Sequence, residues 1–145
     1  MQVEIREADF DPYAELLQYQ TKMQQGGQYG ATTIFVGSMR DFNEGDEVKA
    51  MVLEHYPKMT ENFLLQISQE AAEKWSILDS LIIHRVGEVH PADPIVLVAV
   101  WSAHRKDAYE ANRYIMEALK SKAPFWKKEF LEKGERWVQQ NTPGR

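Results

Sequence analysis

The chain has 145 residues, of which 43% are hydrophobic and 27% charged, a composition that predicts one globular domain over residues 1–145. It contains no cysteine, which excludes disulfides, thiolate metal ligands, a cysteine nucleophile and a persulfide carried on the chain itself. The net charge is −5, but residues 104–136 hold nine Lys/Arg against six Asp/Glu, so this segment is +3 and the rest is −8. A locally positive segment in an acidic protein favours a small anionic ligand over a long nucleic acid.

The first residues differ from a targeting segment. Four charged residues fall between positions 4 and 9, where a signal peptide needs an apolar run. The longest uncharged apolar stretch, residues 94–103, is about half of the roughly 20 residues that a membrane-spanning helix needs. We therefore expect a cytoplasmic protein with no membrane partner, and a flexible tail over about residues 139–145.

The first half of the chain predicts strands around one helix. Residues 3–7 alternate as a short strand, and Asp11-Pro12 is typical of the N-cap and first position of a helix that continues to about residue 25. Residues 29–40 are rich in β-branched side chains and predict a strand, followed by the polar loop "DFNEGDE" and an alternating strand over 48–56. The alternation of that last strand predicts one face with Val48, Ala50, Val52 and Glu54, and another with Met51, Leu53 and His55.

The second half predicts two more helices. The first covers residues 60–75, and the second covers about 106–122 and ends before Ala123-Pro124. The expected strands are residues 81–86, 95–101, 126–130 and 136–138, and "VGEVHPADP" is expected to be a turn. Residues 95–101 are almost continuously apolar, as in a central strand that is covered on both faces. The order β-α-β-β-α-β-β-α-β-β does not alternate strictly, so we predict an α+β fold with a mainly antiparallel sheet and three helices.

Basic residues follow two of the predicted strands and are candidates for anion binding. His104 and Arg105, in "SAHRK", stand where the apolar strand gives way to the third helix, and a helix N-terminus beside a guanidinium suits a phosphate. The structural alternative is an exposed arginine and a histidine that caps the turn. Arg40 follows Gly37 near the end of a strand, where a glycine allows a ligand or another backbone to approach closely. The alternative for Arg40 is an ordinary surface charge.

The segment "KSKAPFWKKEF" places four lysines around a proline and two aromatic residues. Lys120 continues a polar stripe of the third helix, and a solvated helix face is the simplest interpretation of that stripe. A lysine held against Pro124 and the aromatic rings would instead be partly desolvated, which lowers its pKa. If residues 125–129 are extended, Lys127 shares a face with Glu129 and Lys128 points the other way, so only one of these two lysines can enter a pocket.

No metal or nucleotide motif is present in the sequence. The four histidines show neither H-x-H nor H-x-x-x-H spacing, and H-E-x-x-H, the P-loop and G-x-G-x-x-G are all absent. We therefore expect neither a metal site nor a bound cofactor.

Five separated stretches resemble one family, the large, catalytic subunit of molybdopterin synthase. They occur in the same order as in that family and cover about residues 31–138. The matching stretches are "LEHYPKMTE" (53–61), "IIHRVGE" (82–88), "WSAHR" (101–105), "LKSKAPFWKKE" (119–129) and "ERWV" (135–138). The resemblance implies an α+β fold with a small hammerhead-like subdomain.

The resemblance also implies a reaction and partners. The expected assembly is a homodimer of this subunit with one small ubiquitin-like sulfur-carrier subunit at each end, a heterotetramer. The carrier ends in a Gly-Gly thiocarboxylate, from which two sulfurs pass in succession to cyclic pyranopterin monophosphate to form the dithiolene of molybdopterin. Sulfur that arrives on a partner is compatible with a chain that has no cysteine.

The family's pocket, carried over by position, gives the expected site. Its catalytic residues would be Lys120 and Lys127, and its substrate-binding residues would be Ser38, Met39, Arg40, His104, Arg105, Lys128 and Glu129. Two of these positions depart from the family, which often has a lysine in place of Ser38 and an arginine in place of Lys128. The first departure removes a charge, and the second keeps the charge but loses the guanidinium fork.

Two other functions remain open on the sequence alone. The first is a non-enzymatic anion-binding or assembly module, in which the basic segment docks an acidic protein partner. The second is a metal-dependent hydrolase, which the absence of a metal motif disfavours.

Overall fold

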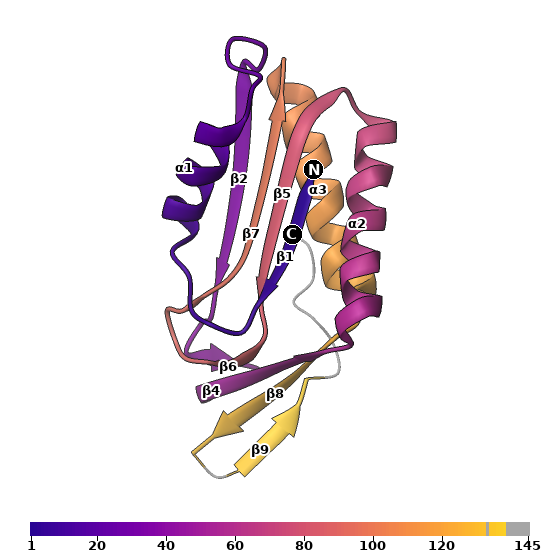
Figure 1. Ribbon diagram of the computed structural model, residues 1–145. Helices are drawn as coiled ribbons and strands as arrows, with labels where there is room; N and C mark the ends of the chain where they lie inside the picture. Colours follow the sequence, from indigo (N-terminus) through magenta and orange to yellow (C-terminus); the bar gives the residue numbers. More distant parts are fainter. Residues whose placement is uncertain (133, 139–145) are drawn as a thin grey trace.

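Two β-sheets and three helices form the fold of the computed structural model (Figure 1), which describes residues 1–132 and 134–138. One sheet has four strands in the order β1 (Gln2–Arg6), β5 (Ile77–Arg85), β7 (Pro94–Ser102) and β2 (Ala31–Ser38), and it is called the larger sheet because its strands contain more residues than those of the five-stranded second sheet. Only β1 and β5 pair in parallel in this sheet. Helix α1 (Pro12–Lys22) covers one face of the sheet, and α2 (Pro57–Lys74) and α3 (Arg105–Lys122) cover the other (Figure 1).

Strand β7 is buried along almost its whole length because both of its faces are covered. Its residues Leu97, Ala99 and Trp101 belong to the core on the α1 side, whereas Val96 and Val98 belong to the core beneath α2 and α3. The near-continuous apolar run therefore marks a central strand, as predicted.

The smaller sheet lies at one end of the larger one (Figure 1). It contains β3 (Phe42–Asn43), β4 (Asp46–His55), β8 (Phe125–Leu131) and β9 (Gly134–Trp137), and β6 (Gly87–Val89) also pairs with β4. The sequence interpretation missed β3 and β6, which it had assigned to a polar loop and a turn. Glu44 and Gly45 both have positive φ and form a two-residue hairpin between β3 and β4, a geometry for which glycine is favoured.

A register shift in β4 changes which side chains face inward. The pairing with β8 is interrupted between Val48 and Ala50, so Val48 joins Met51 and Leu53 among the buried residues. Ala50 is only half-buried. The predicted grouping of Val48 with Ala50 is therefore wrong, because an irregularity of one residue reverses the alternation.

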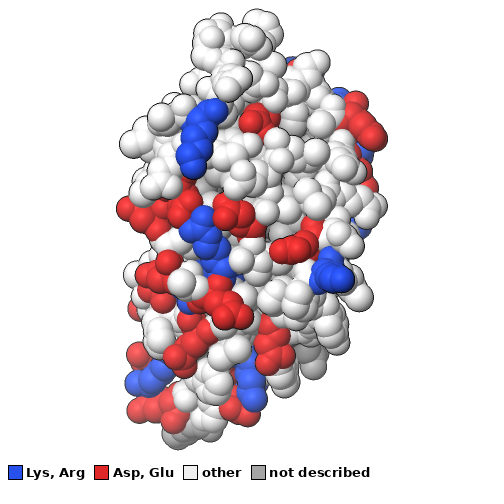
Figure 2. Space-filling view, in the orientation of Figure 1, with Lys and Arg blue, Asp and Glu red and all other residues white. Residues whose placement is uncertain are grey.

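The predicted α+β class, with three helices and mainly antiparallel pairing, is confirmed. Basic side chains on the face shown in Figure 2 are scattered singly among acidic ones. No helix of the described residues is long and apolar enough to cross a membrane. The cytoplasmic location stays a prediction, and the predicted flexible tail lies outside the described residues.

Candidate active site

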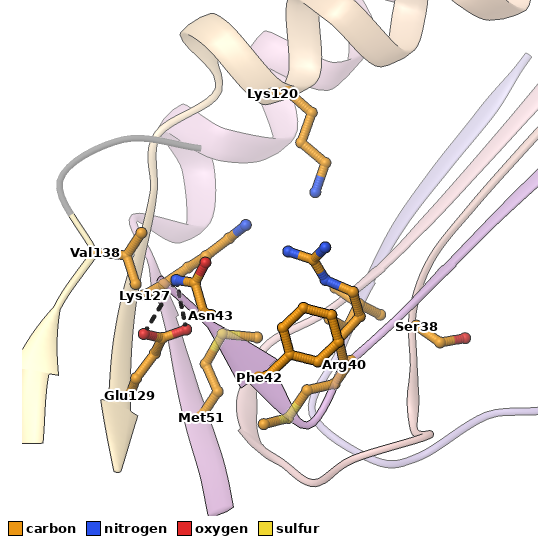
Figure 3. Close-up of a pocket in the computed structure, with 11 residues that line it drawn as sticks. Ser38, Arg40, Phe42, Asn43, Met51, Lys120, Lys127, Glu129 and Val138 are labelled. Carbon is orange, nitrogen blue, oxygen red and sulfur yellow. Dashed lines mark hydrogen bonds between the residues drawn. The ribbon is translucent and has the colours of Figure 1, made fainter. Parts of the chain in front are cut away.

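A cavity of about 120 Å³ lies where the end of α3 meets the smaller sheet. Six of the expected site residues line it (Figure 3), namely Ser38, Met39, Arg40, Lys120, Lys127 and Glu129. The remaining described lining residues are Phe42, Asn43, Met51, Ile95 and Val138. Three cations from separate parts of the chain thus share one small cavity with a single carboxylate.

Lys120 comes from the last turn of α3 and points into this cavity (Figure 3). Burial lowers the pKa of its ammonium group, and the charge of Arg40 lowers it further, while a hydrogen bond with Lys127 acts in the opposite direction. The interpretation of Lys120 as part of a solvated helix face is therefore wrong. The polar stripe of α3 ends at the cavity because the smaller sheet lies beside this last turn.

Lys127 is the more strongly perturbed of the two lysines. Burial is the main cause that lowers the pKa of Lys127 to about 7, and the charge of Lys120 and the hydrogen bond between the two lysines add to it. The pKa of both ammonium groups is thus lowered, because both are buried beside each other and beside Arg40. Near neutral pH the cavity thus offers an ammonium group beside an amine that accepts protons.

Arg40 brings the third cation to the cavity. Its guanidinium lies 5.1 Å from the centre of the Phe42 ring, a cation–π distance that orients the side chain. Figure 3 shows the ends of the Arg40, Lys120 and Lys127 side chains pointing toward one another. Gly37, upstream of Arg40, has a local reason to lack a side chain, because an added Cβ would lie 2.9 Å from Cγ1 of Val96. The group that lies close to Gly37 is therefore the side chain of Val96 in the neighbouring strand β7.

Glu129 is the only carboxylate among the described residues that line the cavity, and it is bonded to its own neighbours. Nδ2 of Asn43 donates to both of its oxygens at 3.2 and 3.0 Å, and Nε of Arg136 donates to Oε1 at 2.9 Å. The residue is 5% exposed. Arg136 and Asn43 were absent from the expected set, although Arg136 stands in the matching stretch "ERWV".

Lys128 lies outside the cavity, on the opposite face of β8 from Lys127. Its ammonium group is 2.8 Å from Oε1 of Glu135 and 5.4 Å from the centre of the Trp137 ring. The strand alternation predicted that only one of these two lysines enters a pocket, and Lys127 is that lysine.

His104 and Arg105 also lie away from the cavity. His104 is the N-cap of α3 without a side-chain capping bond, Arg105 is the first residue of the helix, and both are exposed. Lys120 follows Arg105 by 15 residues, which is about 22 Å along a helix that rises 1.5 Å per residue. A single copy of the chain therefore does not bring these two residues to the lysine pair.

A wider groove of about 760 Å³ adjoins the cavity and shares Ser38, Arg40 and Lys120 with it. The groove runs between β2 and α3, and Phe35 and Tyr109 are among its lining residues. The lysine pair is thus reached from a groove that follows the length of α3.

His84 forms a buried neighbour of the lysine pair that the sequence interpretation did not select. Its ring stacks on Phe125 with 3.9 Å between ring centres, and its Nδ1 lies 2.7 Å from the carbonyl oxygen of Arg85. Burial lowers the pKa of His84 to about 3, and the charges of Lys120 and Lys127 lower it further, so the imidazole stays neutral. The described residues contain no group of His, Cys, Asp and Glu side chains that could hold a metal ion.

Comparison with known proteins identifies the family. The family model described as MoaE protein matches residues 5–122. A molybdopterin synthase catalytic subunit from Haemophilus influenzae is 52% identical over 139 residues, which cover 96% of this chain and 90% of that protein. The X-ray crystal structure of molybdopterin synthase from Staphylococcus aureus matches with a TM-score of 0.83 and 37% identity, over 94% of this chain and 96% of that one.

A further solved structure shares the fold at lower identity. It is a protein–protein complex of subunits 1 and 2 of molybdopterin-converting factor from Helicobacter pylori, with a TM-score of 0.79 and 19% identity over 97% of this chain and 92% of that one. The resemblance seen in the five sequence stretches is thereby confirmed: the chain belongs to the MoaE family, that of the molybdopterin synthase catalytic subunits.

Proposed function

We propose that this protein transfers sulfur from the C-terminal thiocarboxylate of a small carrier subunit to cyclic pyranopterin monophosphate, and so forms the dithiolene of molybdopterin. The observation that carries the proposal is the hydrogen-bonded pair of Lys120 and Lys127 beside Arg40 in one cavity. Donor and acceptor are both anions, and a cluster of three cations favours their approach. The relatives' shared name, molybdopterin synthase catalytic subunit, supports the same reaction.

Each transfer needs two steps, the first at the sulfur of the carrier's thiocarboxylate and the second at its carbonyl carbon. The thiocarboxylate sulfur first bonds to a carbon of the pterin and displaces an oxygen substituent, which leaves a thioester between carrier and pterin. Water then attacks the thioester carbonyl, and the tetrahedral oxyanion collapses with cleavage of its C–S bond. The products are a carboxylate on the carrier and a thiolate on the pterin.

The two lysines suit different parts of the second step. The Lys120 ammonium group points into the cavity, so it stabilises the oxyanion. The Lys127 amine is neutral for about half of the molecules near pH 7, so it accepts the proton of the attacking water. Arg40, at the junction of cavity and groove, binds the phosphate of the pterin.

The same proposal includes a homodimer. Strand β2 is the edge of the larger sheet, and its residues Ile34 and Phe35 are 46% and 40% exposed. An unpaired strand edge next to an apolar groove suits a second copy of the chain. Two copies related by a twofold axis across β2 and α3 would run their α3 helices antiparallel. Arg105 of the partner subunit would then lie near Lys120, and the expected phosphate-binding set would be complete.

The carrier subunit is the second proposed partner, and two such carriers would complete a heterotetramer. The Helicobacter pylori structure holds subunits 1 and 2 of molybdopterin-converting factor, which supports a small partner for this chain as well. The carrier's Gly-Gly tail would enter the cavity, since glycines fit a narrow channel and bring the thiocarboxylate to the lysine pair.

Reconstitution with purified components tests the reaction. The protein, a thiocarboxylated carrier and the cyclic pterin should give dithiolene product, and omission of the thiocarboxylate should abolish it. Lys120→Ala should lower single-turnover product formation by about 10²–10³-fold, the usual effect of removing one oxyanion-stabilising donor. Lys128→Ala is the matched control, since this lysine lies on the opposite face of β8. Tight carrier binding without any product would instead indicate a docking module.

A further inference from the structure

Among the described residues that line the cavity, the carboxylate of Glu129 forms no ion pair with Lys127, the lysine nearest to it on the same face of the strand. Lys127 and Glu129 are two residues apart on one face of β8, which places them about 7 Å apart along the strand. No ion pair joins them in the described part of the chain, although both side chains line the cavity. A buried carboxylate needs a partner that compensates its charge. Because Lys127 is not that partner, another group must hold Glu129.

Arg136 is that group. It stands directly opposite Glu129 in the register of β8 and β9. Its Nε donates to Glu129, one terminal nitrogen donates to the backbone oxygen of Asn43 at 2.8 Å, and the other donates to Asp46 at 2.8 Å. One guanidinium thus ties β9 to Glu129 and to the β3–β4 hairpin at the same time. The Asn43 amide, fixed by this hairpin, completes the shell around the carboxylate.

Arg136 and Lys127 can both pair with Glu129, and this competition favours Arg136. A guanidinium presents several donors in a fixed plane and stays charged, whereas the Lys127 ammonium has one compact charge in a partly buried position. The charged groups that act on Lys127 are Lys120 from α3, Arg40 after β2 and Glu129 on its own strand β8. Neutral His84 faces it from β5, and Arg136 of β9 reaches this cluster through its bond to Glu129. Burial and Lys120 act on Lys127 more strongly than Glu129 does.

We propose that Arg136 is a positioning residue that holds Glu129 against β9 and the β3–β4 hairpin, and thereby leaves Lys127 without a carboxylate partner in the cavity. If Arg136 were absent, Glu129 would turn to Lys127, and the resulting ion pair would keep Lys127 protonated. Only the catalytic consequence rests on the proposed sulfur transfer; the competition for Glu129 is a property of the protein alone.

The test is the titration of Lys127 in the protein without carrier or pterin. Competitive acylation followed by mass spectrometry of the Lys127 peptide gives the pKa of its amine in wild type and in Arg136→Gln. We expect the pKa of Lys127 to rise by at least about one unit, which is a tenfold loss of reactive amine at pH 7. An unchanged titration in the folded Arg136→Gln protein would overturn the proposal.

A double substitution separates the carboxylate from the lost charge of Arg136. Removal of a nearby positive charge alone also raises the pKa of a lysine, so Arg136→Gln is compared with Arg136→Gln/Glu129→Gln. The pKa of Lys127 should return toward its wild-type value in the double variant, because no carboxylate is left to pair with it. A pKa that stays high there would show that the charge of Arg136 acts directly, against the proposal.

Arg136→Lys keeps the test decisive if Arg136→Gln does not fold. A lysine at this position retains the charge but cannot make the three contacts together, so a smaller rise in the pKa of Lys127 is expected. An unchanged pKa in this variant contradicts the proposal. Single-turnover rates add the functional outcome: the pH profile of Arg136→Lys should move to higher pH and keep its plateau.

The two proposals fail in different ways. A Lys127 titration that shifts as expected, in a protein that forms no dithiolene product, would refute the sulfur transfer and leave the role of Arg136 intact. Normal product formation with an unshifted titration would refute the role of Arg136 alone.

Discussion

Lys127 should destabilise the fold when it is charged, and its replacement by methionine should relieve this. The pKa of Lys127 falls from the ordinary lysine value of 10.5 to about 7 in the folded protein. At 1.36 kcal/mol for each pKa unit, that difference corresponds to about 5 kcal/mol. The side chain is partly exposed and solvent screens its charge, so we expect about 1–2 kcal/mol in practice.

The sign of the effect follows from proton binding. Between pH 7 and 10.5 the unfolded chain holds more protons at Lys127 than the folded one, so this group makes stability rise with pH across that window. Below pH 7 both states are protonated and the full penalty is present. Lys127→Met removes the group, so its gain in stability over wild type should be largest at pH 6 and should decline toward pH 10.5.

Urea denaturation of both proteins at pH 6, 8 and 10 measures this difference. Other titrating groups are common to the two proteins, so their contributions cancel in the comparison. Lys128→Met is the control, because its ammonium is ion-paired on the other face of β8. A difference between Lys127→Met and wild type that is the same at all three pH values would refute the reasoning.

Three further predictions concern other parts of the molecule. Lys120→Arg should reduce product formation as severely as Lys120→Ala, since a planar guanidinium does not fit the cavity of about 120 Å³; near-normal single-turnover rates would contradict this. Phe35→Asp should convert the proposed dimer into a monomer in sedimentation velocity, and Tyr13→Asp, at an exposed residue, is its control. Thr60→Val should lower the free energy of unfolding by about 1–3 kcal/mol, because buried Thr60 bonds the backbone of Tyr56 and Pro124; a loss no larger than that of exposed Thr21→Val would count against it.

Much of the fold was predictable because its signals are local. The apolar run of β7, the Asp11-Pro12 start of α1 and the Pro124 stop after α3 each depend on a few neighbouring residues. The register shift between Val48 and Ala50 was not predictable, because a bulge leaves the composition of a strand unchanged. Strand β6 was missed for a related reason, since three residues are too few to show a pattern.

Residue patterns alone predicted the candidate site only as a set of residue types, whereas the family resemblance named six of the residues that line the cavity. Strand alternation correctly separated Lys127 from Lys128, but the helical stripe misplaced Lys120, because a helix pattern does not show which element covers its last turn. The part played by Arg136 depends on the pairing of β8 with β9 and on the β3–β4 hairpin. Such contacts between distant segments have no local signal. The separation of Arg105 from Lys120, by contrast, follows from helix length and was open to calculation.

The bonds of Arg136 also divide the fold into a part that does not need the last strand and a part that does. The strands of the larger sheet and the three helices all lie within residues 1–122. The cavity is different, because it needs Lys127 and Glu129 from β8 and the guanidinium from β9 to hold the earlier β3–β4 hairpin. A chain in which Arg136 has not yet paired with β8 therefore has the residues of its core but no finished cavity.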